Sequence, residues 1–425
     1  MRQLLVVPPR YGAKIALRTL EPTDEENVMA TLELRATRAR NSIWTLFFVM
    51  GVLSMAWVPR IPEIKKSLGI NNGQFGLVLL GSTFGAVIGT QICGRLVHRF
   101  GSKTILRFVT VVMPLGLICI SFAMHSVLAI ITFLFIAAFG YVGIDICVNI
   151  QAVAIEKHLG RRYMSSFHGL WSVGSFVATL FGGVVSHYIS PQINLLSVGI
   201  AGLFINFVAL QYVLGNDEDG HEGSEEATGK IPLFDKKYIA LWLIGVAFIG
   251  ALLPEGAVSD WSAILLKENM GISKGLSATG FGSFALAMIV ARLYGDRVLT
   301  ALGPVKTVKL GGYLGGIGMG LGIAIGVPLS HHHPLLALLI INLGFIIAGL
   351  GIGPMVPAMM LGAAALPGIA PSVAMARIGI IGMGAYFIGP TITGGLAQWI
   401  NLPVAMFFPV ATLILAGWLS RTLKD

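Results

Sequence analysis

Apolar runs of about 20 residues recur along the whole chain, and each is long enough to cross roughly 30 Å of hydrocarbon as an α-helix. Of the 425 residues, 55% are hydrophobic and 12% are charged. A soluble domain normally carries about 25% charged residues, so the composition excludes an ordinary water-soluble fold. The runs are continuous rather than alternating, which excludes a membrane β-barrel. The chain is therefore predicted to be an all-α integral membrane protein.

Twelve transmembrane helices are predicted, arranged as two pseudo-symmetric bundles of six. Their expected boundaries are 41–58, 74–97, 103–123, 126–156, 163–188, 193–214, 237–266, 275–299, 305–328, 334–362, 370–395 and 402–420. The expected domains are a cytoplasmic, largely disordered N-terminal tail at 1–40, an N-terminal bundle at 41–214, an acidic cytoplasmic linker at 215–236 and a C-terminal bundle at 237–425. Met29 is an alternative start to Met1.

Lys and Arg residues orient the predicted bundle. With both termini in the cytoplasm, 24 of the 29 fall on the cytoplasmic side, as the positive-inside rule requires for a protein of the cytoplasmic membrane. The net charge of +9 follows from this topology and from contact with anionic membrane lipids, so it does not call for a nucleic-acid partner. Three cysteines lie inside predicted spans and read as small buried hydrophobic residues. No metal site and no cofactor is predicted, and we expect a monomer.

The two halves of the chain follow the same pattern. The stretches that begin at Trp57 and Trp261 both pass through a charged external segment to a Gly-Ile pair, at Gly69 and Gly271. Each then continues into a Gly/Ala-rich span that ends in a charged cytoplasmic turn. Internal duplication of this kind is typical of secondary transporters, which bind their substrate between the two repeats.

A short loop carries a family signature. The stretch GRLVHRFGSK at 94–103 resembles the loop motif of the major facilitator superfamily in four residues, Gly94, Arg99, Gly101 and Lys103. His98 stands where that family usually has Asp. The second-half copy, ARLYGDR at 291–297, is degenerate and keeps Arg292, Gly295 and Asp296. We expect the charged residues of both loops to form gate or loop ion pairs.

Two longer stretches, 143–174 and 254–266, resemble the fucose-permease-like branch of this superfamily, which includes many uncharacterised bacterial transporters. The resemblance implies a twelve-helix transporter, not an enzyme, that moves a small polar solute together with protons. Sugars are the best-known substrates of the branch. The first span has no acidic residue, where the sugar–proton symporter of the branch uses one. The coupling site of this chain is therefore expected elsewhere.

Three polar residues, Asp145, Asn149 and Glu156, follow one face of the span at 126–156. A carboxylate at the bilayer centre costs about 2.5–3.5 kcal/mol on the insertion scale, which disfavours a lipid-facing position. Asp145 is therefore expected to face an aqueous cavity and to carry the transported proton. The alternative is a structural carboxylate bonded to a neighbouring helix. Glu156, close to Arg161, is expected to form a gate or loop ion pair.

The next span supplies the candidate substrate contacts. When spans four and five are folded back near residue 159, His168 reaches almost the depth of Asn149, with Trp171 beside it. Hydroxyls, amides and an indole face suit a sugar or polyol, and equally other polar solutes; a buried His is alternatively a structural residue. The substrate-binding candidates are Asn149, Gln151, His168, Trp171 and Ser172, and further polar candidates are Gln91, Tyr386 and Gln398.

The seventh span contains two acids, Glu255 within a helix-weakening Pro-Glu-Gly stretch and Asp260 after it, and Pro254 is expected to interrupt the helix. Glu255 lies nearer mid-depth and is the second candidate proton carrier, while Asp260 is a candidate external gate. Five residues apart, they point about 140° from each other and are not expected to form a dyad. Arg377 is expected to pair with a carboxylate, to bind an anionic substrate group, or to sit at the inner interface.

Taken together, these features predict a secondary active transporter that moves a small polar solute, sugar-like or a related metabolite, by alternating access with proton symport. The alternative is proton-driven efflux of amphipathic drug-like compounds, which requires a large aromatic cavity. No nucleotide-binding loop, nucleophile elbow or zinc-ligand spacing is present in the sequence. A membrane sensor or an intramembrane enzyme therefore fits the sequence less well.

Overall fold

The computed structural model describes residues 22–220, 238–369 and 371–423, and this part of the chain is helical throughout apart from its turns. The first half contains α1 (Pro22–Met55), α2 (Ile61–Leu68), α3 (Asn72–Phe100), α4 (Ser102–Phe122), α5 (Val127–Leu159), α6 (Met164–Val185) and α7 (Pro191–Ala209). The second half contains α8 (Ile239–Ile264), α9 (Lys274–Ser277), α10 (Thr279–Leu329), α11 (Pro334–Ile352), α12 (Met355–Ala364), α13 (Pro371–Gly382), α14 (Gly384–Trp399), α15 (Leu402–Ala405) and α16 (Phe407–Leu419).

Eleven helical segments in the described residues are long and apolar enough to cross a membrane. One of them, Lys274–Leu329, has 56 residues, or about 84 Å of helix, which is far more than one crossing needs. Gly303, with φ 73° and ψ 167°, breaks α10 just before Pro304, because only glycine adopts this conformation readily. The segment is therefore two spans, and the described part of the chain contains the twelve predicted spans.

The first helix begins earlier than expected. α1 starts at Pro22, so residues 22–40, predicted as a disordered tail, are helical, whereas residues 1–21 lie outside the described part. The segment is rich in Glu, Ala, Leu and Arg, which favour helix, and it continues a helix that is already formed. Ala36 and Ala39 are buried, and Arg35 forms an ion pair of 2.8 Å with Glu218.

The expected linker at 215–236 begins with an ordered segment rather than a solvated one. The buried Asp219 carboxylate accepts hydrogen bonds from the backbone N–H of Ser102 at 2.7 Å and from its hydroxyl at 2.6 Å. Asn216 accepts a further bond from the N–H of Lys103 at 3.0 Å. These bonds satisfy N–H groups at the start of α4, where a carboxylate also complements the helix dipole. Residues 221–237 of the linker lie outside the described part.

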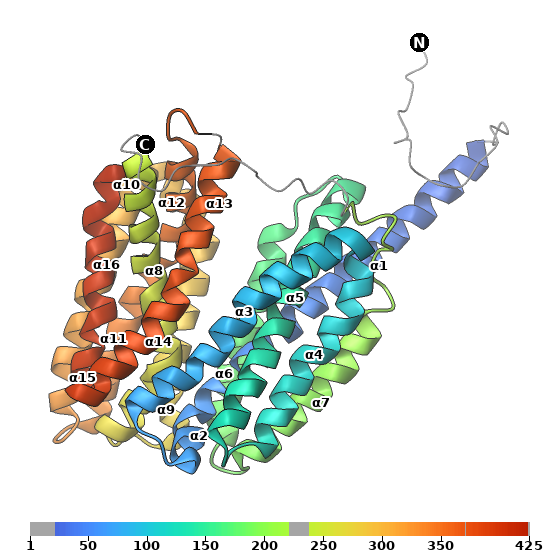
Figure 1. The fold of residues 1–425 in the computed structure, drawn as a ribbon. Coiled ribbons are helices and arrows are strands. Elements are labelled where there is room, and N and C mark those ends of the chain that lie inside the picture. The colour runs from blue at the N-terminus through green and yellow to red at the C-terminus, as the bar shows by residue number, and fades with distance from the viewer. Residues whose placement is uncertain (1–21, 221–237, 370, 424–425) are drawn as a thin grey trace.

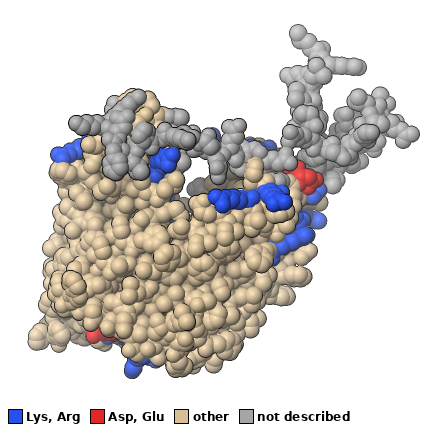
Figure 2. All heavy atoms as spheres, viewed as in Figure 1, with Lys and Arg blue, Asp and Glu red and all other residues tan. Residues whose placement is uncertain are grey.

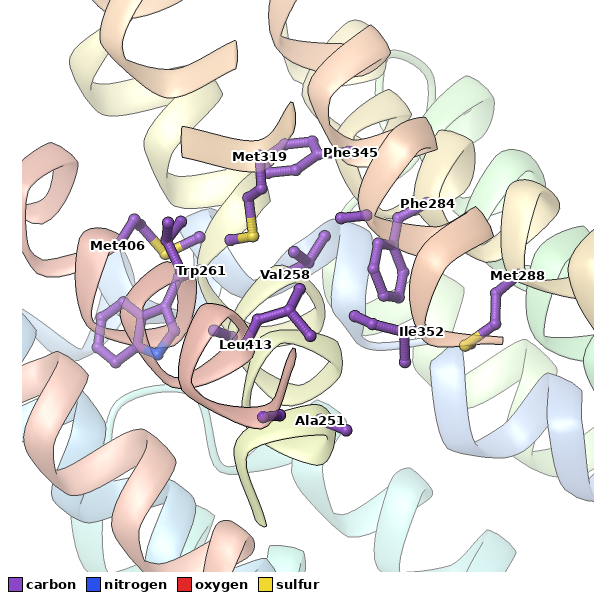
Figure 3. Packing of buried hydrophobic residues seen from close by; sticks show 14 of the residues in the cluster. Ala251, Val258, Trp261, Phe284, Met288, Met319, Phe345, Ile352, Met406 and Leu413 are labelled. Atoms are coloured by element: carbon purple, nitrogen blue, oxygen red, sulfur yellow. The ribbon is translucent and has the colours of Figure 1, made fainter. Parts of the chain in front are cut away.

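Each half has its own hydrophobic core, and the two cores join at one end. The core of the second half surrounds α8, whose Val258 and Trp261 lie near Met406 and Leu413 (Figure 3). It also includes residues of the first half, namely Val58, Ile61, Phe75 and Leu79. In Figure 1 the two bundles converge around α2 and α9 and diverge toward the end that carries the C-terminus.

The end formed by α2 and α9, called the closed end below, is held by polar contacts between the halves. Lys65 pairs with Glu268 at 2.7 Å, and Lys274 pairs with Glu63 at 3.0 Å. The backbone N–H of Gly275 donates to His187 Nε2 at 3.2 Å. Across the same boundary, α3 packs against α14 and α6 packs against α10.

Lys and Arg side chains gather mainly at the opposite end, called the basic end below (Figure 2). The surface between the two ends shows few charges in this view and is formed by apolar helix faces. Leu128, Phe204 and Leu293 are among the exposed large apolar side chains. Apolar faces of this kind are expected where helices meet lipid instead of water.

Candidate functional site: a cavity between the two halves

A cavity of about 410 Å³ lies between the halves. It is lined by α1, α3, α4, α5 and α6 from the first half and by α8, α10 and α14 from the second. Its lining is mainly apolar, and its aromatic residues are Trp57, Tyr141, Trp171, Trp261, Phe281 and Tyr386. The volume falls in the range of small-molecule sites, roughly 300–1,000 Å³. A metabolite-sized ligand would contact both halves at once.

Two carboxylates, Glu255 and Asp260, line this cavity. α8 runs as one helix through Pro254, so the predicted interruption at this proline is wrong. The helix is packed against α13, α14 and α16, which hold it in place despite the missing donor of Pro254. The irregular stretch comes later, as a π-helical turn at Leu265–Asn269. The acids therefore occupy one continuous helix, not a broken one.

The two acids have different surroundings. The Glu255 carboxylate lies 3.8 Å from the guanidinium of Arg292 in α10, a long ion pair in which both side chains are partly exposed. Asp260 makes no hydrogen bond or ion pair with any described residue. It is also not part of the polar contacts at the closed end, which Glu63, Glu268 and their partners form. The structure thus places Asp260 in the cavity lining, and its role as an external gate stays a prediction.

The pair shares one cavity although the helical spacing separates the side chains by about 140° around α8 and about 7.5 Å along it. They can share it because the cavity borders several sides of α8 between residues 252 and 261. No bond joins the two carboxylates in the described structure. The prediction that they do not form a dyad agrees with this arrangement.

A group of polar residues lies between the cavity and the basic end; we call Asp145, Asn149, His168, Glu255 and Arg292 the polar layer. The amide of Asn149 donates to the Asp145 carboxylate at 3.0 Å, and His168 Nε2 lies 3.2 Å from the Asn149 amide oxygen. These three come from the first half. The contact between spans four and five was predicted from the sequence, and the His168–Asn149 bond confirms it.

The polar layer also crosses between the halves. Arg292 of the second half lies within electrostatic range of His168 of the first. Tyr386 of α14 lies within electrostatic range of Asp145, Glu255 and Arg292. Asp145 and His168 are not among the residues that line the cavity itself. The acid, amide and histidine of the first half therefore face the second half on the basic side of the cavity.

Three further candidates have defined places. Trp171 and Ser172 line the cavity, where Ser172 donates to the backbone oxygen of His168 at 3.1 Å. The indole N–H of Trp171 is buried and lies near the Tyr141 hydroxyl, without a hydrogen bond of good geometry in the described structure. Gln151 is fully buried elsewhere: it donates to Ser102 Oγ at 2.8 Å and accepts from the N–H of Leu214 at 2.9 Å. Gln151 as a substrate contact is thus a wrong prediction, because its amide is fully used between helices.

The loop and gate candidates also differ from expectation. Glu156 accepts hydrogen bonds from the N–H groups of Tyr163 and Met164, and so caps the start of α6 instead of pairing with Arg161, which is exposed. Arg292 forms an ion pair, as was expected of it, although its partner is Glu255 of the cavity lining and not a loop residue. Arg99, Lys103 and Asp296 form no ion pair with described residues. Arg377 lies half-buried in α13.

Tyr141 and the four charged residues that form the closed-end ion pairs were not predicted as functional residues from the sequence. Tyr141 lies one helical turn before Asp145, so extending the polar stripe by four residues would have found it. The Lys65–Glu268 and Lys274–Glu63 pairs join residues that are about half the chain apart. No local sequence pattern predicts these two ion pairs.

Two bundles of six spans around a shared central cavity are the architecture of a secondary membrane transporter. The family model of the Major Facilitator Superfamily matches residues 43–372, and the chain belongs to this superfamily. An uncharacterized MFS-type transporter of Yersinia pestis is 32% identical over 373 residues, covering 87% of this chain and 91% of the relative. An uncharacterized transporter of Sinorhizobium fredii is 29% identical over 385 residues, covering 89% and 96%.

Among solved structures, the nucleoside transporter NupG superposes with a TM-score of 0.73 at 13% identity. The match covers 91% of this chain and 99% of the NupG chain. At this identity the similarity concerns the fold alone. The predicted superfamily and the predicted twelve-helix transporter fold are both confirmed.

Proposed function

We propose that this chain moves a small polar solute across the cytoplasmic membrane by alternating access, coupled to protons. The proposal is carried by one observation: two carboxylates, Glu255 and Asp260, line a largely apolar cavity to which both halves contribute. A solute in this cavity contacts the two bodies that move relative to each other. Its binding can therefore be linked to their movement.

We place the basic end in the cytoplasm, because positively charged loops favour that side. The conformation then faces inward, with the closed end sealing the cavity from the outside. The Lys65–Glu268 and Lys274–Glu63 pairs and the packing of α3 on α14 support this seal. The second state of the cycle requires these contacts to separate while the basic end closes.

The carboxylates supply the proton coupling in this proposal. A carboxylate surrounded by apolar lining is costly as an anion, so it takes up a proton when water reaches it and no cation is near. Asp260 has no partner in the described structure, which suits it to this role. Glu255 is held only by its 3.8 Å contact with Arg292. A proton on Glu255 would remove that attraction.

Arg292 links proton binding to movement of the halves. Arg292 lies within electrostatic range of His168, whose ring contacts Asn149, and Asn149 donates to the Asp145 carboxylate. Closure of the basic end would bring Arg292 closer to Asp145. The Arg292–Glu255 ion pair would then be replaced by an Arg292–Asp145 ion pair. Asp145 thus acts in the proposed cycle as the partner of Arg292, in place of the proton-carrier role expected from the sequence.

The experiment uses purified protein in proteoliposomes. A thermal-shift screen against sugars, polyols, organic acids, amines and drugs identifies a solute, and uptake or efflux of that solute is then measured with and without a pH gradient. Glu255→Gln and Asp260→Asn should lose the response to the gradient. Asp217→Asn, an exposed acid outside the spans without an ion pair among the described residues, is the matched control and should keep it. Unchanged coupling in both cavity variants would refute the proposal.

A second candidate, proton-driven efflux of amphipathic compounds, is favoured by the aromatic lining of the cavity. Six aromatic residues, counted in the lining given above, would hold flat apolar molecules with little specificity. Drug-susceptibility profiling of a deletion strain separates the two candidates. Increased sensitivity to several unrelated compounds supports efflux, and a defect confined to one solute supports specific transport.

A further inference from the structure

Acidic side chains outnumber basic ones in and around the cavity. Its lining contains two carboxylates and no Lys, Arg or His. When the polar layer is included, three carboxylates (Asp145, Glu255 and Asp260) stand against the single guanidinium of Arg292 and the neutral-or-cationic imidazole of His168. An anionic solute would have to lose its water beside these acids with no base in the lining to receive it. This excess of acidic groups favours a positively charged ligand over an anionic one.

Asp260 is the group that most requires a counter-charge. The charged or titratable side chains that line the cavity with it are Glu255 on its own helix, Tyr141 from α5 and Tyr386 from α14. The other elements, α1, α3, α4, α6 and α10, contribute only apolar, Ser, Thr and Trp side chains to the lining. No group in the lining can therefore neutralise the Asp260 carboxylate. A proton or a cationic ligand must do so.

The aromatic residues add a second feature that suits a cation. Tyr141, Trp171 and Tyr386 contribute rings to the same lining, and aromatic faces attract alkylammonium groups once water is excluded. The buried Trp171 indole N–H makes no hydrogen bond of good geometry in the described structure, where the Tyr141 hydroxyl is a nearby polar group, and an ether or hydroxyl oxygen of a ligand would accept from it. Ser54, Ser172 and Ser259 offer further hydroxyls.

We propose that the solute is a small organic cation, a protonated amine that also carries hydroxyl or ether oxygens, and that its ammonium group exchanges with the proton of Asp260. This rests on the proposed function and specifies its substrate class. The exchange balances: one proton leaves the carboxyl group as one ammonium group binds, and the reverse occurs on the other side of the membrane. Coupling through Asp260 is then a one-for-one, electroneutral antiport.

The test measures binding and proton release on the full-length protein in nanodiscs. Isothermal titration calorimetry is run with matched probes: glucosamine and other protonated amino sugars, the parent sugars, and the corresponding sugar phosphates. Buffers of different ionisation enthalpy report the protons released. We expect amines to bind at least tenfold more tightly than the uncharged parents, with close to one proton released per amine bound. We expect no binding of the phosphates.

Asp260→Asn should abolish both the amine preference and the proton release, while Asp217→Asn keeps them and both variants melt like the unaltered protein. Equal or better binding of uncharged or anionic probes, or binding of no probe of any class, overturns the cation proposal. A pH gradient that drives uncharged solutes through Asp260 overturns it too but leaves the proposed function standing. A pH gradient that drives no solute of any charge refutes the proposed function as well.

Discussion

Gly76→Ala should shift this protein away from the conformation described. A Cβ at Gly76 of α3 would lie 2.5 Å from the backbone oxygen of Pro390 and 3.2 Å from Cα of Gly394, both in α14 of the other half. Backbone atoms cannot rotate away as side chains do, so the helices must separate. The clash exists only while the closed end is closed, because α3 and α14 belong to different halves.

Overpacking of this kind costs about 1–3 kcal/mol. Since the cost falls on one of two conformations, it changes their ratio by about 5- to 150-fold in favour of the conformation that is open at the closed end. The stability of each bundle should change little, because no contact within a bundle is lost.

The assay is a distance measurement by pulsed electron spin resonance between labels at Gln192 and His332. Both residues are exposed and lie at the closed end in different halves. Gly395→Ala is the control: it is also on α14, and a Cβ there meets nothing within 4 Å. Gly76→Ala should add a longer-distance population that Gly395→Ala lacks. If Gly76→Ala and Gly395→Ala both give the distances of the parent protein, the contact at Gly76 does not hold the closed end shut.

Three further outcomes follow from the packing. Asp219→Ala removes both acceptor bonds to Ser102 and should lower the stability of the first bundle by about 2–4 kcal/mol, seen as a lower melting midpoint; an unchanged midpoint contradicts the capping role. Gln151→Leu leaves the N–H of Leu214 without its acceptor and should lower the free energy of unfolding by about 1–3 kcal/mol without altering solute affinity. A changed Kd for the solute would show that Gln151 contacts it. Lys65→Gln breaks a partly exposed ion pair worth about 0–1 kcal/mol, so it should change the spin-label distances less than Gly76→Ala does. A change as large as that of Gly76→Ala would contradict this expectation.

The span count was predictable because hydropathy is a local property. Each crossing needs its own apolar run, and twelve runs are visible in the sequence, even where the helix of α10 continues as far as Gly303 before it breaks. The start of α1 was not predictable from hydropathy, since residues 22–40 are polar. Their helix depends on propensity and on the Arg35 contact with Glu218, far along the chain.

The candidate site was predictable only in part. The stripe from Asp145 to Asn149 and its contact with His168 follow from helical periodicity and a short connection between two spans. Asp260 and Glu255 were visible as acids in an apolar run, but their common cavity depends on how α8 is surrounded by both halves. Gln151 has the same sequence signature as a ligand-binding amide. Only its buried bonds to Ser102 and Leu214 reveal a structural role.

Coupled transport requires that water and solute reach the carboxylates from one side of the membrane at a time, and thiol labelling tests this most directly. A single cysteine at Ser259, between the two acids in the cavity lining, is introduced after replacement of Cys93, Cys119 and Cys147. We predict that a membrane-impermeant thiol reagent modifies it from the cytoplasmic side, that bound solute protects it, and that Gly76→Ala adds modification from outside. No modification from either side, or labelling only by lipid-soluble reagents, would contradict the account.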